Sequence, residues 1–157
     1  MSVAFRRESD DEHLEPTFEL PIPPGPNLVT PRGLALIEAR VRALEAGLAE
    51  TLTEEERKPL LRDARYWRAR QASAQVVPAP SGDEVALGTR VTYVREGETK
   101  TIEIVGHDES DPANARIAFT APLVRAMIGS AVGDEVDLPD GNTLTIIAIA
   151  PSDSFAA

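Results

Sequence analysis

Apolar residues between positions 30 and 77 recur with the spacing of amphipathic helices. Thr30 followed by Pro31 is typical of a helix start, because Thr caps the first turn and Pro suits its first position. Two series, apolar except for Gln71, then recur every three or four residues: Leu34, Ile37, Val41, Leu44 and Leu48, and after a break Leu60, Ala64, Trp67, Gln71 and Ala74. Two helices joined by a short turn pack antiparallel, so the pattern predicts a coiled-coil hairpin over residues 30–77.

The start of the second helix has two interpretations. Thr53 with the Glu three residues later matches a capping box, which would begin the helix at Glu54 and place Pro59 beyond the first turn, where it should kink the helix. A start near Lys58 would instead give Pro59 a favourable terminal position. The sequence does not choose between these two starts.

The pattern changes to strand-like alternation after residue 82. Five segments alternate or run apolar and are separated by turn residues, and one short helix begins at a proline: strands at 90–95, 100–105, 116–119, 135–138 and 144–149, helix at 121–128. Leu123, Met127 and Ile128 of that helix are expected in the core. The whole chain is therefore predicted to be α+β, with a helical hairpin followed by an antiparallel sheet and one short helix.

Proline-rich stretches divide the chain. Residues 21–26 belong to an acidic leader, and residues 78–82 separate the helical pattern from the strands. Apolar residues at even spacing in the leader fit a strand that pairs with a sheet edge, a short docking peptide or a disordered segment: Leu14, Phe18, Leu20 and Ile22. The predicted layout is a leader at 1–29, the hairpin at 30–77, a linker at 78–82, the β-rich domain at 83–150 and a tail at 151–157.

Charge and composition exclude several classes of function. The net charge is −10, so binding of duplex DNA through counterion release is not expected. The chain has no Cys and two His, which excludes thiolate metal sites and leaves few zinc ligands. No cofactor and no metal site is therefore predicted. No 18-residue apolar run and no signal-peptide pattern is present, so the chain is expected to be soluble, cytoplasmic and free of membrane contact.

The second helix carries a basic stripe, Arg62, Arg65 and Arg68, with one Arg at every third position. These side chains could form exposed salt bridges with Glu38 or Glu45. They could equally face nucleic acid or an acidic protein surface. The sequence leaves both possibilities open.

Three runs in the β-rich segment resemble one protein family. They are residues 104–111 (IVGHDESD), 116–129 (RIAFTAPLVRAMIG) and 132–136 (VGDEV). The C-terminal domain of the bacterial Gre transcript-cleavage factors has a similar pattern, roughly I-V-G-x-D-E-x-D, I-S-x-x-S-P-L-A-R-A-L-I-G and V-G-D-x-V. The resemblance covers residues 83–150 and implies an FKBP-like fold that binds the rim of the RNA polymerase secondary channel. The family's N-terminal coiled coil is similar to the hairpin predicted here.

The resemblance also implies which residues contact the polymerase. The family's S-P-L-A-R-A-L segment maps onto Thr120, Ala121, Pro122, Leu123 and Arg125. Ala121 stands where the family has Ser, so a side-chain hydrogen bond is lost there. Pro122 and Arg125 are the better candidates for contact.

The hairpin tip departs from the family. Gre factors carry a D-x-x-E-N motif whose carboxylates hold Mg²⁺ in the polymerase active site, and this chain lacks it. Its tip instead has Glu54, Glu55 and Glu56, which capping and the helix dipole explain at least as well as metal binding. The hairpin is also shorter than the family's. The chain is thus predicted to have no catalytic residues, to be no enzyme, and to modulate transcription without efficient transcript cleavage.

Several alternatives remain from the sequence. The chain could be a true cleavage-stimulating factor that uses its Glu-rich tip, or lie nearer to the regulators of nucleoside diphosphate kinase, which share a shortened coiled coil. An FKBP-like fold also raises peptidyl-prolyl isomerase activity, although the domain offers only Tyr93 and Phe119 for an aromatic pocket. A free-standing coiled-coil interaction protein is the last alternative. The expected partner is bacterial RNA polymerase, with indirect contact to nascent RNA, and the short connection favours a monomer.

Overall fold

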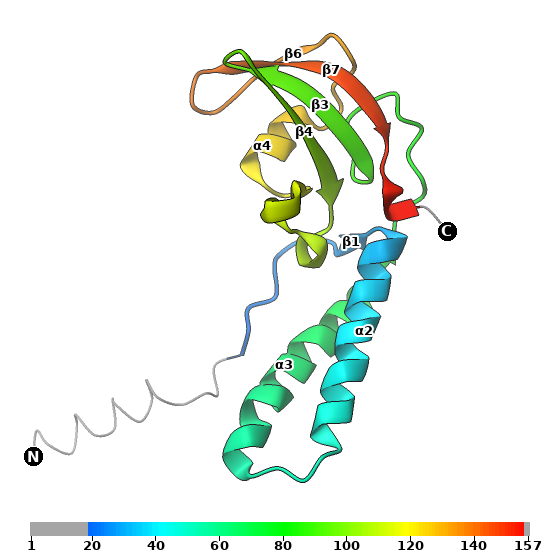
Figure 1. Cartoon of the computed structure of the whole chain (residues 1–157), viewed down its shortest axis with the longest axis vertical. Helices are drawn as coiled ribbons and strands as arrows, with labels where there is room; N and C mark the ends of the chain where they lie inside the picture. Colours follow the sequence, from blue (N-terminus) through cyan, green and yellow to red (C-terminus); the bar gives the residue numbers. More distant parts are fainter. Residues whose placement is uncertain (1–18, 156–157) are drawn as a thin grey trace, which may run out of the picture.

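A computed structural model describes residues 19–155 and shows a helical hairpin that projects from a β-rich base (Figure 1). The fold is α+β, as the sequence predicts. Leu14 and Phe18 of the leader lie outside the described residues. No helix within residues 19–155 combines the length and apolar composition needed to cross a bilayer.

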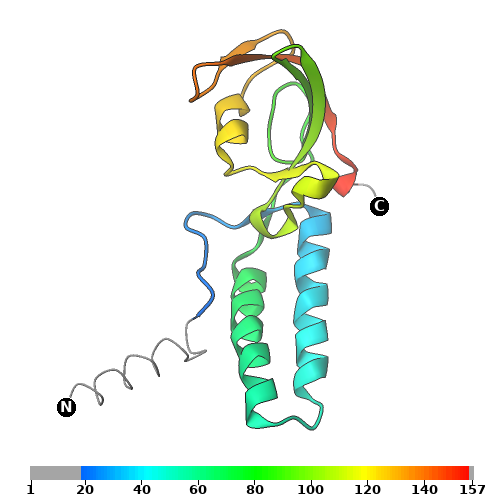
Figure 2. The same cartoon turned by 60° about the vertical axis from the view of Figure 1, so that its left-hand side comes forward.

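The hairpin consists of α2 (Pro31–Leu48) and α3 (Glu54–Ser73), which run antiparallel as predicted (Figure 2). The Thr30 hydroxyl accepts a hydrogen bond from the Gly33 amide at 3.0 Å and so caps α2. Ile37, Val41 and Ala64 are buried between the helices. The heptad seam therefore closes within the chain.

Helix α3 begins at Glu54, which decides between the two starts that the sequence allows. The Thr53 amide donates to the Glu56 carboxylate at 2.9 Å, and the Glu56 amide donates to the Thr53 hydroxyl at 3.1 Å. This reciprocal capping box satisfies two backbone donors that a start near Lys58 would leave without partners. Pro59 consequently lies inside the helix.

The base is a five-stranded sheet in the order β5-β4-β3-β7-β6. Its strands are β3 (Thr89–Arg95), β4 (Glu98–Val105), β5 (Arg116–Ala118), β6 (Glu135–Asp137) and β7 (Thr143–Pro151). The expectation of a wholly antiparallel sheet is wrong at one pairing, because β5 runs parallel to β4. Only Glu103 to Val105 of β4 pair with β5. The chain that follows Val105 therefore runs back to the level of Glu103 before β5 begins at Arg116, and the two strands point the same way.

Helix α4 (Pro122–Met127) covers one face of the sheet and completes the core. The fully buried side chains there are Val85, Val91, Ile104, Val124, Met127, Leu144 and Ile146. Met127 is in the core as predicted, and Leu123 is half-buried. The core prediction for Ile128 is wrong: its side chain is 45% exposed, because the helix ends at Met127 and Ile128 turns out of it before Gly129 (φ +89°).

Two short strands join the hairpin to the base. β1 (Leu28–Val29) pairs in parallel with β2 (Gln75–Val76), and both Asn27 and Val29 are buried. The last residues of the segment that the sequence assigns to the leader are thus part of the fold. Residues 19–26 form no helix or strand.

Candidate functional site

The three glutamates of the hairpin tip occupy the first turn of α3, at the end of the hairpin farthest from the base (Figure 2). All three are exposed. Glu56 is engaged in the capping box, which leaves Glu54 and Glu55. Within residues 19–155, no three His, Asp or Glu side chains are grouped so that they could hold a metal ion.

Each member of the basic stripe pairs with a carboxylate. Arg65 binds Glu19 through two hydrogen bonds of 2.6 and 2.7 Å, Arg68 lies 3.3 Å from Glu45, and Arg62 lies 3.2 Å from Asp63. Glu45 is one of the two partners that the sequence suggests. The bond from Arg65 lowers the pKa of Glu19. The stripe is thus partly neutralised, although its exposed ion pairs are weak enough for a partner to displace.

The residues that the family resemblance assigns to polymerase binding lie together at the start of α4. Thr120, Pro122 and Arg125 are exposed, while Ala121 and Leu123 are half-buried. Ala121 occupies the N-cap position and gives no side-chain hydrogen bond. The exposed members of this group therefore form the part of it that a partner can reach.

Arg125 lies between two hollows of the surface. One is apolar, about 390 Å³, and is lined by Leu28, Phe119 and Ile128 among others. The second measures about 350 Å³ and is lined by Pro122, Arg125, Ala126 and Pro139. Sequence reasoning missed the apolar hollow because it placed Ile128 in the core; the Gly that follows Ile128 was the available signal.

Asp108 ties α3 to the base. Its carboxylate accepts hydrogen bonds from the Tyr66 hydroxyl at 2.5 Å and from Arg70 Nε at 2.6 Å. Both side chains of the Arg70–Asp108 ion pair are at least 95% buried, and Arg70 also donates to Asn27 Oδ1 at 2.7 Å. Burial, followed by the bond to Asp108, raises the pKa of Tyr66 to about 12. The phenol therefore stays protonated as a donor at neutral pH.

Glu109 ties α2 to the base in the same way. The Thr30 hydroxyl donates to Oε1 at 2.6 Å, and Arg32 Nε donates to Oε2 at 2.6 Å. A Cβ on Gly33 would come within 2.8 Å of Glu109 Oε1, so a larger residue there would force the Glu109 carboxylate to shift. The adjacent pair Asp108 and Glu109 thus holds both helices.

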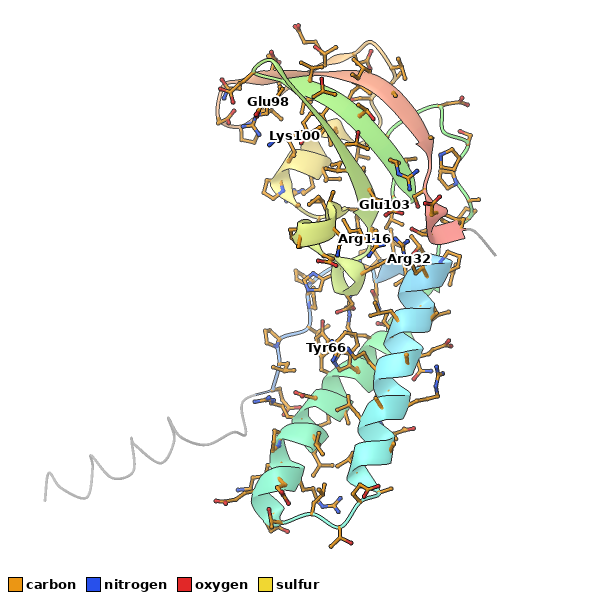
Figure 3. The ribbon with its side chains drawn as sticks, in the orientation of Figure 1. Arg32, Tyr66, Glu98, Lys100, Glu103 and Arg116 are labelled. Atoms are coloured by element: carbon orange, nitrogen blue, oxygen red, sulfur yellow. The ribbon has the colours of Figure 1, made fainter. Side chains whose placement is uncertain are left out.

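A third carboxylate extends this network. Figure 3 shows that Arg32, Glu103 and Arg116 converge where α2 meets the sheet. Arg32 lies 3.1 Å and Arg116 3.4 Å from Glu103, and Ser154 also donates to Glu103 at 3.1 Å. Burial raises the pKa of Glu103, but hydrogen bonds from Arg32 and from the serines outweigh it, so the pKa is lowered.

This junction was not found by sequence reasoning. Asp108 and Glu109 belong to the run at 104–111, which the sequence identifies only through a family pattern, and their partners lie about 40 and 80 positions away. Adjacent acidic residues directly after a strand were the available signal. In the structure, Asp108 and Glu109 bind both helices and so hold the direction of the hairpin.

Comparison with known proteins gives matches centred on the base. Residues 79–151 match the family model "Transcription elongation factor, GreA/GreB, C-term". The transcription elongation factor GreA of Lactococcus lactis subsp. cremoris is 49% identical over 59 residues, 36% of this chain and 38% of that protein. GreA of Desulfovibrio desulfuricans is 39% identical over 93 residues, 55% and 57% of the two chains.

One solved structure with similarity over more of the chain is that of the GreA factor homolog 1 (Gfh1) protein of Thermus thermophilus. It is 17% identical, with a TM-score of 0.39, over 80% of this chain and 99% of that one. The chain spans 38% and 57% of the length of the two curated relatives named above.

Proposed function

Because residues 79–151 match the GreA/GreB C-terminal family model, we propose that the chain binds bacterial RNA polymerase at its secondary channel in the cytoplasm and modulates transcription. The observation that carries the proposal is the rigid attachment of a projecting hairpin to this domain. Asp108 and Glu109 hold α3 and α2, so a partner that binds the base also receives the hairpin in one direction.

The base binds the polymerase through the exposed start of α4. Pro122 and Arg125 both line the hollow at Pro139, so its wall combines apolar surface with a positive charge. The apolar hollow at Phe119 and Ile128 continues this surface. Exposed apolar surface next to an arginine is typical of the central part of a protein interface.

The hairpin occupies the channel without supplying a catalytic metal. Glu56 is used by the helix cap, and Glu54 and Glu55 are adjacent exposed residues on separate faces of a helical turn. Mg²⁺ requires convergent oxygen ligands in near-octahedral geometry. The tip thus favours a modulator of transcription over a cleavage factor, and its nearness to nascent RNA is indirect.

The chain acts as a monomer. Ile37, Val41 and Ala64 are already buried in the seam between α2 and α3, which favours a hairpin that closes within one chain. Light scattering after gel filtration measures the oligomeric state.

The structure does not favour peptidyl-prolyl isomerase activity. Tyr93 is buried, at 3% exposure, and so adds nothing to an aromatic isomerase pocket.

Binding to core polymerase tests the proposal. The full chain should co-purify with core polymerase and compete with an authentic cleavage factor. Arg125→Ala should weaken binding about tenfold, as expected for the loss of one charged interface contact. The matched control is Arg90→Ala, since Arg90 lies on the face of β3 opposite the core side chain of Val91. Absence of binding, or equal weakening by both variants, would refute the proposal.

A further inference from the structure

A cleft of about 440 Å³ lies where the hairpin meets the base. Leu36, Arg40 and Trp67 line it from the hairpin, and His107 and Arg116 line it from the base. Its volume is within the range of small-molecule sites. The functions discussed above make no use of this cleft.

Two of the three carboxylates that line the cleft form ion pairs. Asp108 binds Tyr66 and Arg70, Glu109 binds Thr30 and Arg32, and Asp111 accepts a bond of 2.7 Å from Asn114. Ion pairs at 2.6 Å leave the first two carboxylates with little uncompensated charge.

Arg40 is different. Among residues 19–155, no carboxylate lies within ion-pair distance of its guanidinium, which instead sits 5.4 Å from the centre of the Trp67 ring. Across the cleft, the guanidinium of Arg116 has one ion-pair partner among residues 19–155, Glu103 at 3.4 Å. Arg40 and Arg116 therefore supply one guanidinium from each wall that an anion can reach, and Asp111 is the carboxylate of the described lining that has no ion pair.

The cleft also offers a flat apolar wall. Leu36 is 38% exposed there, and Trp67 is partly exposed beside it. An aromatic ring and a stacked guanidinium favour planar ligands. We propose that the cleft binds a free nucleoside phosphate, with its base against Leu36 and Trp67 and its phosphates between Arg40 and Arg116.

A free nucleotide fits the charge of the molecule better than a nucleic-acid strand does. The chain carries a net charge of −10, which repels an extended polyanion along its length. Fields are screened over about 8 Å at physiological salt, so a small ligand inside the cleft experiences mainly the nearby guanidiniums. A bound nucleotide would contact the hairpin and the base together and stiffen the junction.

The single Trp of the chain makes the site directly measurable, because Trp67 fluorescence reports only on this cleft. The intact protein is titrated with GDP, ADP, inorganic pyrophosphate and adenosine. We expect saturable quenching by the two nucleotides, competition by pyrophosphate and a much weaker effect of adenosine, which lacks the phosphates.

Calorimetry then tests the residues, since Arg40 touches the fluorophore. Arg40→Ala and Arg116→Ala should each weaken nucleotide binding about tenfold, the cost of one charged hydrogen bond. Arg42→Ala is the matched control, because Arg42 is on the same helix but does not line the cleft. The proposal fails if nucleotides give no saturable binding at millimolar concentration, or if the Arg40 and Arg116 variants bind like wild type. Tighter binding of a short RNA than of GDP would also overturn it and assign the cleft to a strand. None of these results depends on polymerase binding.

Discussion

The two ends of the hairpin use acidic residues in opposite ways. At the base, Asp108 and Glu109 are buried, and each accepts two hydrogen bonds of 2.5–2.6 Å from hairpin residues. At the tip, Glu54 and Glu55 are exposed, and only Glu56 has a defined role, in the helix cap. The fold therefore stabilises the direction of the hairpin. At its far end, Glu56 caps α3, and Glu54 and Glu55 are exposed to solvent.

This difference predicts that the two ends of the hairpin respond differently to mutation. A buried ion pair tolerates little change in geometry, because separating it leaves an uncompensated charge. An exposed carboxylate imposes no such constraint. The junction should therefore be sensitive to mutation, and the tip should not be.

The strongest test of the contrast is removal of the carboxylate that holds α3. Asp108→Ala leaves Arg70, only 3% exposed, without its charge partner. The free energy of unfolding should fall by about 3–5 kcal/mol, measured by urea denaturation followed by circular dichroism. A loss below about 1 kcal/mol, as for an exposed pair, would show that the junction is not a buried clamp.

Replacing Glu103 tests the buried junction through the pH dependence of the free energy of unfolding. Its pKa is lowered in the folded chain, so its stabilising contribution is present above the ordinary carboxyl pKa of 4.5 and is lost as the pH falls through the lowered value. Glu103→Gln should cost about 1–3 kcal/mol at pH 7, from the loss of its charged hydrogen bonds. The difference between mutant and wild type should shrink below pH 4.5, and a pH-independent difference would contradict this origin.

Two capping threonines allow the ends to be compared with one substitution. Thr53→Ala removes an exposed cap and should cost about 1 kcal/mol. Thr30→Ala removes a cap and also the buried bond to Glu109, so its cost should be larger by about 1 kcal/mol. Parallel urea titrations measure both, and equal costs would count against a special junction.

The smallest effect is expected midway along the hairpin. Glu45 and Arg68 form an ion pair of 3.3 Å with both side chains about half exposed. Glu45→Gln should change the free energy of unfolding by less than about 0.5 kcal/mol, since exposed pairs are screened by water and salt. A change of the size expected for Asp108 would remove the distinction between buried and exposed pairs.

The sequence was sufficient for elements whose signals are local. The heptad series and the strand alternation predict the hairpin and the five strands of the base. The Thr53 capping box was one of two starts that the sequence allowed for the second helix, and β1 and β2 were not predicted. The parallel pairing of β5 escaped prediction, because strand direction depends on the path of the loop that follows Val105. Ile128 was misplaced because helical spacing continued past the true helix end.

Only part of the candidate site could be predicted from the sequence. The start of α4 was located by a family pattern that includes Pro122 and Arg125, and their role in binding stays a prediction. The junction depends on contacts such as Thr30 to Glu109 and Tyr66 to Asp108, whose partners are distant in the chain. Periodicity carries no information about such pairs.

Transcript cleavage in backtracked elongation complexes tests the central claim most directly. The intact chain, added with Mg²⁺ to complexes that an authentic cleavage factor shortens, should bind them and slow that shortening by competition while producing no RNA fragments itself. RNA shortening by the chain alone that disappears in the Glu54→Gln, Glu55→Gln double variant would contradict the account.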